Sequence, residues 1–309
     1  MPEWRASVVV PTYNQREALE ITLRSFEHQA EAGGAWEVVV VDDGSTDGTD
    51  RAVEAYRAPY PLQYLRRPHA GRAAARNAGV ERSRGEVVIF CDGDRPVGNR
   101  FVREHLRRHQ GGERMVVVGG VWELYFSDLR ARRDDLLADL PHDLRRHQRL
   151  ARQPAYTRAV YRMFDADGET RHAAPWIAFF SGNASVGARM LRDAGGFDPG
   201  FVEWGFEHFE LGYRLHAAGA RFVHHPAARN YHLAHRRKEG FYERSIRSSL
   251  AYFRAHHPSP AVQLFEEFLY GRISLEEYHA RVAGEASMPP RDGPAVFFRQ
   301  LGGAPAARE

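Results

Sequence analysis

Short hydrophobic runs alternate with longer amphipathic segments in the first part of the chain. The runs are rich in Val and Ile and occupy residues 6–10, 36–41, 62–65, 87–91 and 115–118. Runs of this length, closed by turn residues, are typical of strands buried on both faces of a parallel sheet. Between them, apolar side chains recur at helical spacing over residues 15–30, 50–57, 72–81 and 100–109. This alternation predicts βαβ units, and so an α/β fold with a mostly parallel, Rossmann-like sheet flanked by helices.

The pattern changes after the fifth run. Residues 124–164 are dense in Arg, Asp and Leu at helical spacing and carry little strand signal, which predicts a helical insertion over the sheet. The later elements expected from the same reasoning are a polar turn at 181–185, a helix opened by residues 203–211 and running to about Gly219, a short strand at 222–224, and helices at about 239–256 and 261–282. From about residue 284 the chain is rich in Pro, Gly and Ala, which predicts a loosely held tail.

Two of the predicted strands end in acidic turns. Asp42 and Asp43 follow the run at 36–41, and Asp92 and Asp94 follow the run at 87–91. The carboxyl ends of parallel strands meet at one edge of a sheet, where open α/β sheets bind their ligands. Carboxylates gathered there repel one another unless a cation or a hydroxyl-rich ligand is bound. The pattern therefore predicts a divalent ion, Mg²⁺ or Mn²⁺, held together with the phosphates of a substrate.

A second Asp-x-Asp occurs at Asp165 and Asp167, but no buried strand precedes it. It is typical of a hairpin turn, and we do not expect it to hold a metal ion.

Composition excludes several classes of protein. The chain has 309 residues, 43% of them hydrophobic and 27% charged, with a formal net charge of +3. Arginines and acids are interspersed and aromatic residues do not interleave with the arginines, which argues against a nucleic-acid partner. The one cysteine, Cys91, excludes an internal disulfide and is expected to be a small buried side chain. No apolar run reaches the roughly 18 residues of a membrane span, and the N-terminus lacks a signal-peptide pattern, so a cytoplasmic protein is expected.

The order of motifs resembles that of the family 2 glycosyltransferases. The motifs are Val-Val-Pro-Thr-Tyr-Asn at 9–14, Val-Asp-Asp-Gly-Ser-Thr-Asp at 41–47, Gly-Arg-Ala-Ala-Ala-Arg-Asn at 71–77, Asp-Gly-Asp at 92–94 and Glu-Trp-Gly-Phe-Glu-His-Phe-Glu-Leu-Gly-Tyr-Arg-Leu at 203–215. The last resembles a version with Trp-Gly before the acid that occurs in galactosyl- and N-acetylgalactosaminyltransferases. The likeness covers about residues 5–236. It implies a glycosyltransferase-A fold, a nucleotide-sugar donor (a UDP-sugar before others), a divalent metal and usually inversion at the anomeric carbon.

The resemblance also implies a domain plan. A catalytic domain would span residues 1–236, with a nucleotide-binding half at 1–98 and an acceptor and catalytic half at 175–236. The insertion at 124–164 would lie between the halves, and residues 237–309 would form a helical extension and tail. A homodimer through the insertion or the C-terminal helices is one arrangement that this plan allows.

Donor contacts carry over position by position. Those that the resemblance implies are Pro11, Thr12 and Tyr13 around the nucleoside, Asp43 accepting a hydrogen bond from the base, Arg72, Arg76 and Asn77 near the diphosphate or base, and Asp92 at the ribose or a metal-bound water. Arginine near a helix start suits phosphate binding. Ordinary alternatives are an N-cap role for Asp43 and a surface position for the arginines.

The metal would be held by Asp94 and by a histidine from the C-terminal part of the domain. His232 is placed ahead of His235, because it follows an aromatic residue, and His224 and His225 rank lower. Imidazole is an acceptable ligand for Mn²⁺, and either histidine could donate to phosphate instead.

The catalytic base is the least determined assignment. Inverting relatives usually carry Glu-Asp, with the aspartate as base, where this chain has Glu207 and His208. Glu207 could act as the base, His208 could do so because imidazole titrates near pH 6.5, or the enzyme could retain configuration without a base. We favour inversion with Glu207 as base and keep Glu210, three residues along the same helix, as a further candidate.

Sugar contacts are predicted at Trp204 and Gly205, which would form a floor under a sugar ring, and at Asn183, which would bond sugar hydroxyls. A core anchor and a turn residue are the alternatives for Trp204 and Asn183. The acceptor, whether glycan, lipid, small molecule or peptide, is not specified by any motif.

Two other functions fit parts of the pattern. A nucleotidyltransferase would need a Gly-rich loop with Lys or Arg after the first strand, and residues 11–15 are not one. A nucleotide-sugar-binding protein that lost catalysis through the change to His208 is the non-enzymatic alternative.

Overall fold

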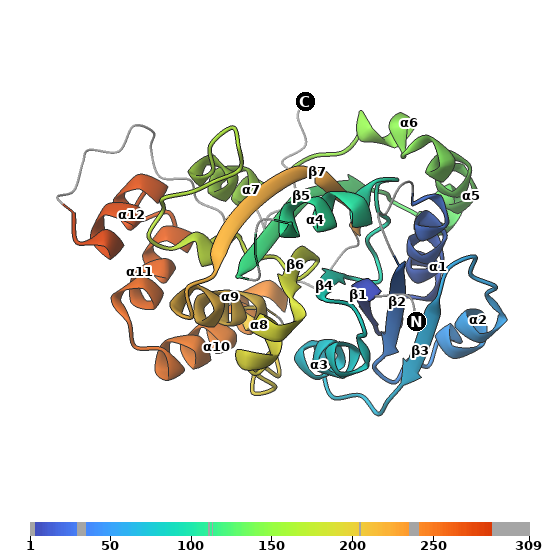
Figure 1. Ribbon diagram of the computed structural model, residues 1–309, viewed down its shortest axis with the longest axis horizontal. Coiled ribbons are helices and arrows are strands. Elements are labelled where there is room, and N and C mark those ends of the chain that lie inside the picture. Colours follow the sequence, from blue (N-terminus) through green and yellow to red (C-terminus); the bar gives the residue numbers. More distant parts are fainter. Residues whose placement is uncertain are drawn as a thin grey trace.

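The computed structural model describes residues 4–29, 35–110, 112, 114–203, 205–234 and 241–285. Within these residues the chain forms a seven-stranded sheet in the order β3-β2-β1-β4-β6-β5-β7 (Figure 1). The strands are β1 (Trp4–Thr12), β2 (Ala35–Asp42), β3 (Leu62–Arg66), β4 (Val87–Cys91), β5 (Met115–Tyr125), β6 (Asn183–Gly187) and β7 (Arg221–Ala234). Strands β3, β2, β1 and β4 are parallel neighbours, as are β5 and β7. Only β6 among the described strands runs against its neighbours, so the predicted mostly parallel sheet is confirmed.

Helices cover both faces of the sheet and extend beyond it at the β7 end (Figure 1). Those connecting the first strands are α1 (Arg16–Ser25), α2 (Thr49–Ala55), α3 (Arg72–Arg82) and α4 (Phe101–His109). The later ones are α5 (Leu129–Asp139), α6 (Arg145–Gln148), α7 (Ala155–Val160), α8 (Ala188–Asp193), α9 (Glu207–Ala217), α10 (Phe241–His256), α11 (Pro260–Leu269) and α12 (Leu275–Ala283). Short 3-10 turns lie at Phe26–His28, Leu140–His142, Tyr161–Met163 and Pro175–Ala178. None of the described helices is both long enough and apolar enough to cross a bilayer.

Alternation along the central strands explains why both faces are covered. Val9 and Phe90 pack into a core that includes Trp176 and helices α8 to α12, whereas Val8 and Ile89 pack against α1 and α4 on the other face. Successive strand residues point to opposite faces, so an unbroken apolar run can be buried only between two layers. The same core holds α11 and α12 against Trp176, which ties the C-terminal helices to the sheet.

Three predicted boundaries were wrong. Residues 183–185 belong to β6 and are fully buried, whereas the sequence predicted a polar turn over 181–185. Strand β5 continues to Tyr125, past the predicted start of the insertion, and β7 is far longer than the predicted strand at 222–224. The β5–β7 pairing explains both, since it continues past an irregularity at Gly119 and Gly120. Pairing across a bulge between distant segments leaves no local signal in the sequence.

The small polar residues of β6 are buried because α4 provides their partners. His105, which is 0% exposed, lies with Nε2 3.0 Å from Asn183 Oδ1 and Nδ1 2.9 Å from Ser185 Oγ. His109 Nε2 lies 2.8 Å from the same hydroxyl. One arrangement satisfies every atom when both imidazoles are neutral: His109 donates to Ser185, Ser185 donates to His105, and His105 donates to Asn183.

Acid should weaken the fold through His105. Burial lowers the pKa of His105 from 6.5 to about 3, and the bond to Asn183 opposes this only in part. Because the unfolded chain binds the proton more readily, this contribution is intact above pH 6.5 and is lost as pH falls towards the folded value. We expect it to lower the free energy of unfolding by about 2 kcal/mol between pH 7 and pH 5.

Urea titrations at the two pH values measure this. His105→Gln should show a pH dependence smaller than that of the wild-type protein by that amount, while the exposed His142→Gln should keep the wild-type dependence. An identical pH dependence in the His105 variant would contradict the assignment.

Candidate active site

A cavity of about 1010 Å³ opens at the carboxyl ends of β1, β2 and β4. Its other walls include residues of α3, Pro154, Tyr156 and Thr157, residues 180–182, and residues 201–203 and 205–209 at and before the start of α9. The predicted site residues in its lining are Pro11, Thr12, Tyr13, Asp43, Arg72, Arg76, Asp92, Asp94, Gly205, Glu207, His208 and His232. Residues from distant parts of the chain therefore meet in one hollow at the predicted edge of the sheet.

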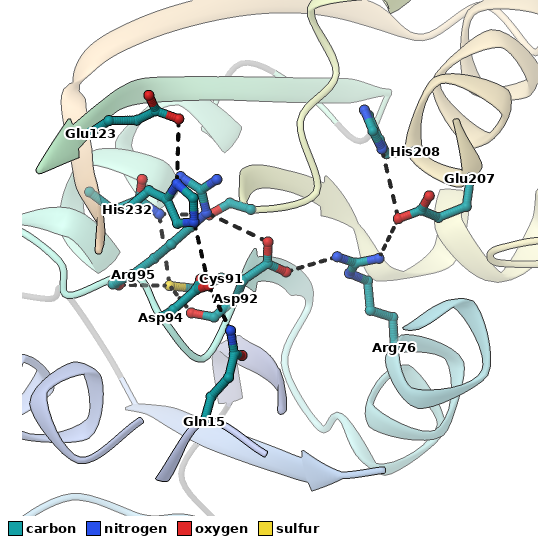
Figure 2. A network of polar contacts seen from close by, with 12 residues as sticks. Gln15, Arg76, Cys91, Asp92, Asp94, Arg95, Glu123, Glu207, His208 and His232 are labelled. Carbon is teal, nitrogen blue, oxygen red and sulfur yellow. Dashed lines mark hydrogen bonds and ion pairs between the residues drawn. The ribbon is translucent and has the colours of Figure 1, made fainter. Parts of the chain in front are cut away.

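Arg76 joins the acidic turn to α9 through a buried pair of ion pairs (Figure 2). Its side chain rises from α3, and the residue is 2% exposed. Nη2 donates to Asp92 Oδ1 at 2.8 Å and Nη1 donates to Glu207 Oε1 at 3.0 Å. Burial disfavours the charged guanidinium, but the two carboxylates outweigh it and raise the pKa of Arg76. A forked cation suits this place because it can hold two separate carboxylates at once.

Glu207 is the first residue of α9 and carries an unsatisfied oxygen. Glu207 is 4% exposed, and its Oε2 has no hydrogen-bond partner among the described residues. Burial would raise the pKa of this carboxyl, but the neighbouring imidazole of His208 and the charges of Arg76 and Arg72 outweigh burial and hold the pKa below its ordinary value. The result is an ionised carboxylate with one oxygen fixed by Arg76 and the other available to a bound molecule.

The turn before α9 sets the direction of Glu207. Gly205 and Phe206 both have positive φ angles, 93° and 70°, and the Phe206 side chain is buried in the core. A left-handed Phe is costly and persists only where surrounding packing enforces it. His208 follows, its Nδ1 3.8 Å from Glu207 Oε1 and its ring packed on Phe209. Both side chains of this pair line the cavity.

Asp94 lies at the centre of a second polar group (Figure 2). Its Oδ2 is 3.4 Å from His232 Nε2 and accepts a hydrogen bond of 2.8 Å from Gln15 Nε2. His232 lies within β7, not after a strand as predicted, and faces its register partner Glu123 of β5 across 3.4 Å. Burial and Arg95 lower the pKa of His232, but the hydrogen bonds to Asp94 and Glu123 outweigh them, so the pKa is raised.

These donors fit a divalent ion in part. A carboxylate oxygen and an imidazole nitrogen converge on one side of the cavity, a donor set that Mn²⁺ accepts. No group of three or more His, Cys, Asp or Glu side chains in the described part of the chain is arranged to hold a metal. The arrangement therefore suits an ion that completes its shell with water and substrate phosphates.

Asp43 also lines the cavity and lies in a turn whose backbone N–H groups donate to its carboxylate. Oδ1 accepts from the backbone N–H of Ala70 at 3.1 Å, and Oδ2 accepts from that of Gly71 at 2.8 Å. The imidazole of His69 lies 2.8 Å from Oδ2 and stacks on Tyr13, with ring centroids 4.2 Å apart. Asp43 is thus fixed as a hydrogen-bond acceptor beside an aromatic surface.

Gln15, His69, Arg95 and Glu123 are among the cavity residues that sequence reasoning missed. Arg95 directly follows Asp94, and its Nε and Nη1 are buried without a hydrogen-bond partner among the described residues. A Cβ at Gly182 would lie 2.4 Å from that Nε, so any larger residue there would force the guanidinium to move from this position. An arginine next to paired carboxylates was a usable signal for Arg95, whereas Gln15, His69 and Glu123 carry no motif of their own.

Three predicted residues lie outside the cavity lining because the protein uses their polar groups itself. Asn77 exchanges two hydrogen bonds with the backbone of Phe197, and Asn183 is held by His105, Gly120 and Ala228. Glu210 accepts from Arg214 and His257 and fastens α9 to α10.

The lower-ranked histidines are engaged elsewhere too. His225 pairs with Glu104, and His224 stacks on Tyr161. The predicted sugar contact Trp204 and the predicted ligand His235 lie outside the described residues.

Several solved structures resemble this chain in fold. The chain resembles a crystal structure of Staphylococcus aureus TarS at 17% identity, with a TM-score of 0.59 over 90% of this chain and 70% of that one. It also resembles the mannosyltransferase PcManGT of Pyrobaculum calidifontis, solved with GDP-Man and Mn²⁺, at 20% identity and a TM-score of 0.56 over 92% and 73% of the two chains. At these identities the likeness shows the fold, which is that of the glycosyltransferase-A enzymes, as predicted.

Proteins related in sequence are more similar to this chain than the solved structures are. The chain is 31% identical to the uncharacterized glycosyltransferase YfnE of Bacillus subtilis over 71% of this chain and 62% of that one. It is 30% identical to the validoxylamine A glucosyltransferase of Streptomyces hygroscopicus subsp. limoneus over 90% of this chain and 64% of that one. The chain thus spans less than two thirds of the length of either relative.

The acidic turns, the donor-side strands and the predicted insertion all fall within residues 7–173, the part that matches the model of the family described as Glycosyl transferase family 2. With the fold, the cavity and the relatives in agreement, the chain belongs to glycosyl transferase family 2.

Proposed function

We propose that the protein transfers a sugar from a nucleotide-sugar donor, a UDP-sugar before others, to an acceptor hydroxyl with inversion at the anomeric carbon. One observation carries this proposal. A single cavity is lined by the Tyr13 ring and the Asp43 carboxylate, by Asp94 beside His232, and by Glu207, whose Oε2 has no hydrogen-bond partner among the described residues.

The donor lies along the edge of the sheet in this proposal. Asp43 accepts an N–H of the base, since both of its oxygens are presented as acceptors in a fixed turn. The diphosphate reaches the cations Arg72 and Arg95, which line the same wall. Relatives in fold bind such donors: TarS was solved with UDP and with UDP-GlcNAc, and PcManGT with GDP-Man and Mn²⁺.

Asp94 and His232 would hold the divalent ion, which when bound supplies Lewis-acid stabilisation of the leaving diphosphate. Gln15 and Glu123 keep these two side chains in place through their hydrogen bonds to Asp94 and His232. Arg95 adds a fixed positive charge beside the leaving group.

Glu207 receives the proton in the transfer step. The acceptor oxygen forms a bond to the anomeric carbon as the bond from that carbon to the phosphate oxygen breaks, and the bonding electrons leave with the nucleoside diphosphate. The hydroxyl proton passes to Oε2 of Glu207, while Arg76 holds Oε1 and so fixes the direction of Oε2. A carboxylate with a low pKa is a sufficient base because the hydroxyl becomes acidic as its oxygen bonds to carbon.

The acceptor enters beside α9 in this proposal. Tyr156, Thr157 and Phe180 line the cavity on the side of His208, across from the donor edge. Aromatic faces there suit the C–H faces of a ring-shaped acceptor.

A panel of UDP-, GDP- and dTDP-sugars, each incubated with Mn²⁺ and with a chelator, tests the proposal through release of nucleoside diphosphate. We expect slow hydrolysis of a UDP-sugar that requires the metal and that speeds up when a sugar or cyclitol acceptor is added. Nucleotide binding without turnover under any condition would instead identify a binding protein that has lost catalysis.

A further inference from the structure

His69 makes the two contacts that a nucleobase would need in this cavity. Its imidazole stacks on Tyr13 at 4.2 Å with the rings inclined by 20°, and its Nδ1 lies 2.8 Å from Asp43 Oδ2 and 3.1 Å from the backbone oxygen of Asp43, with which it forms a hydrogen bond. Tyr13 and His69 both line the cavity and are about half exposed, at 44% for the residue and 55% for the side chain. An aromatic ring held between a tyrosine face and a carboxylate has the geometry expected of a bound base.

The turn that carries His69 is held by contacts other than those of the imidazole. A Cβ at Gly44 would lie 2.9 Å from the amide nitrogen of His69, so the two segments are in close contact there. The Asp43 carboxylate accepts hydrogen bonds from the backbone N–H groups of Ala70 and Gly71. Turning the imidazole away would break its hydrogen bond to the Asp43 backbone oxygen and vacate Tyr13 and one acceptor position on the carboxylate, while these backbone contacts remain.

We propose that His69 occupies the place of the donor's nucleobase in the ligand-free protein and must turn away when the nucleotide binds. This inference rests on the proposed function, because it takes Tyr13 and Asp43 as the base site. Uracil has a flat ring that can stack on Tyr13 and an N3–H that can donate to Asp43. It can therefore replace both contacts of the imidazole.

Self-occupation of a site lowers its apparent affinity. A ligand that binds only the open form has an apparent dissociation constant equal to its intrinsic value divided by the open fraction. Removing the imidazole abolishes the competing stack and hydrogen bond, so we expect His69→Ala to bind UDP about fivefold to fiftyfold more tightly than the wild-type protein.

Calorimetric titration with UDP, uridine and pyrophosphate measures this without requiring turnover. The gain in His69→Ala should be equal for UDP and uridine, because the competition is at the base, and absent for pyrophosphate. His69→Phe keeps a ring on Tyr13 but cannot bond Asp43, so its affinity for UDP should lie between those of the wild-type protein and His69→Ala. Tyr13→Ala should weaken the binding of UDP and of uridine by similar factors.

A matched control exists on the far helix. The ring of His256 also packs against a tyrosine, Tyr252, with centroids 4.0 Å apart, and its Nδ1 bonds the backbone oxygen of that tyrosine, but His256 does not line the cavity. His256→Ala should leave UDP affinity unchanged. Weaker or unchanged UDP binding by His69→Ala would overturn the inference and leave the proposed function intact, the former by showing that His69 supports the base. A wild-type protein that binds no nucleoside diphosphate would overturn both.

Discussion

Glu207→Gln is expected to lower kcat by about 10²- to 10⁴-fold, the usual contribution of a general base. Glutamine keeps the shape of the side chain and an oxygen for Arg76, so the buried cation stays paired while Oε2 loses its capacity to take a proton. UDP affinity should change little, since in the proposed mechanism Glu207 contacts the acceptor and not the nucleotide. Steady-state kinetics and UDP titration of the same preparation separate the two effects.

Glu210→Gln is the matched control, a buried glutamate on the same helix that lies outside the cavity lining. It should lose thermal stability through its partners Arg214 and His257 and keep kcat within a few fold. Equal losses of kcat in the two variants would show that Glu207 acts through helix packing, and unimpaired turnover by Glu207→Gln would move the base to His208 or to a retaining mechanism.

Asp94→Asn is expected to lower kcat/KM by about 10³-fold or more at any Mn²⁺ concentration, because several kcal/mol of leaving-group stabilisation depend on the ion. The amide keeps the size of the side chain and loses the negative charge that would draw the cation to His232. Mn²⁺ titration followed by electron paramagnetic resonance, with and without UDP, reports binding of the metal directly.

Asp167→Asn is the control for the loss of an aspartate from an Asp-x-Asp sequence that is not expected to bind a metal ion. Its turn is exposed, and Asp165 there accepts hydrogen bonds from the backbone of that turn. We expect wild-type metal binding and turnover from this variant. Full activity of Asp94→Asn in a chelator would show that the arginines neutralise the diphosphate without a metal.

Local patterns predicted the donor half of the molecule well. The runs that became β1, β2 and β4 are short, apolar and closed by turn residues, and burial on both faces leaves little freedom in their assignment. Placing Asp43, Asp92 and Asp94 at one edge needed only the rule that parallel strands share direction. In the structure these three acids line one cavity, as that rule predicts.

The remaining errors come from pairings that lie far apart in the sequence. Asn183 and Ser185 were predicted to lie in a polar turn. They are instead buried in the sheet, where they form hydrogen bonds with His105 of α4, which lies 78 and 80 residues earlier in the chain. Likewise, the β5–β7 ladder extends both strands and places His232 opposite Glu123. Neither partner can be inferred from its own neighbourhood, because a polar residue looks the same whether water or a distant side chain satisfies it.

The antiparallel course of β6 gives this fold a replaceable part. Asn183 at the start of β6 pairs with Cys91 at the end of β4, so the chain returns to the sheet at the edge where it left it after Tyr125. The chain between these points, residues 126–182, contains α5, α6 and α7, and its last turn is fixed because Trp176 and Phe179 lie in the core. Residues 127–135 at the start of α5 are mostly exposed, and Leu129 and Arg130 among them line the cavity. This stretch can therefore change, and alter one part of the cavity wall, without shifting the register of any strand.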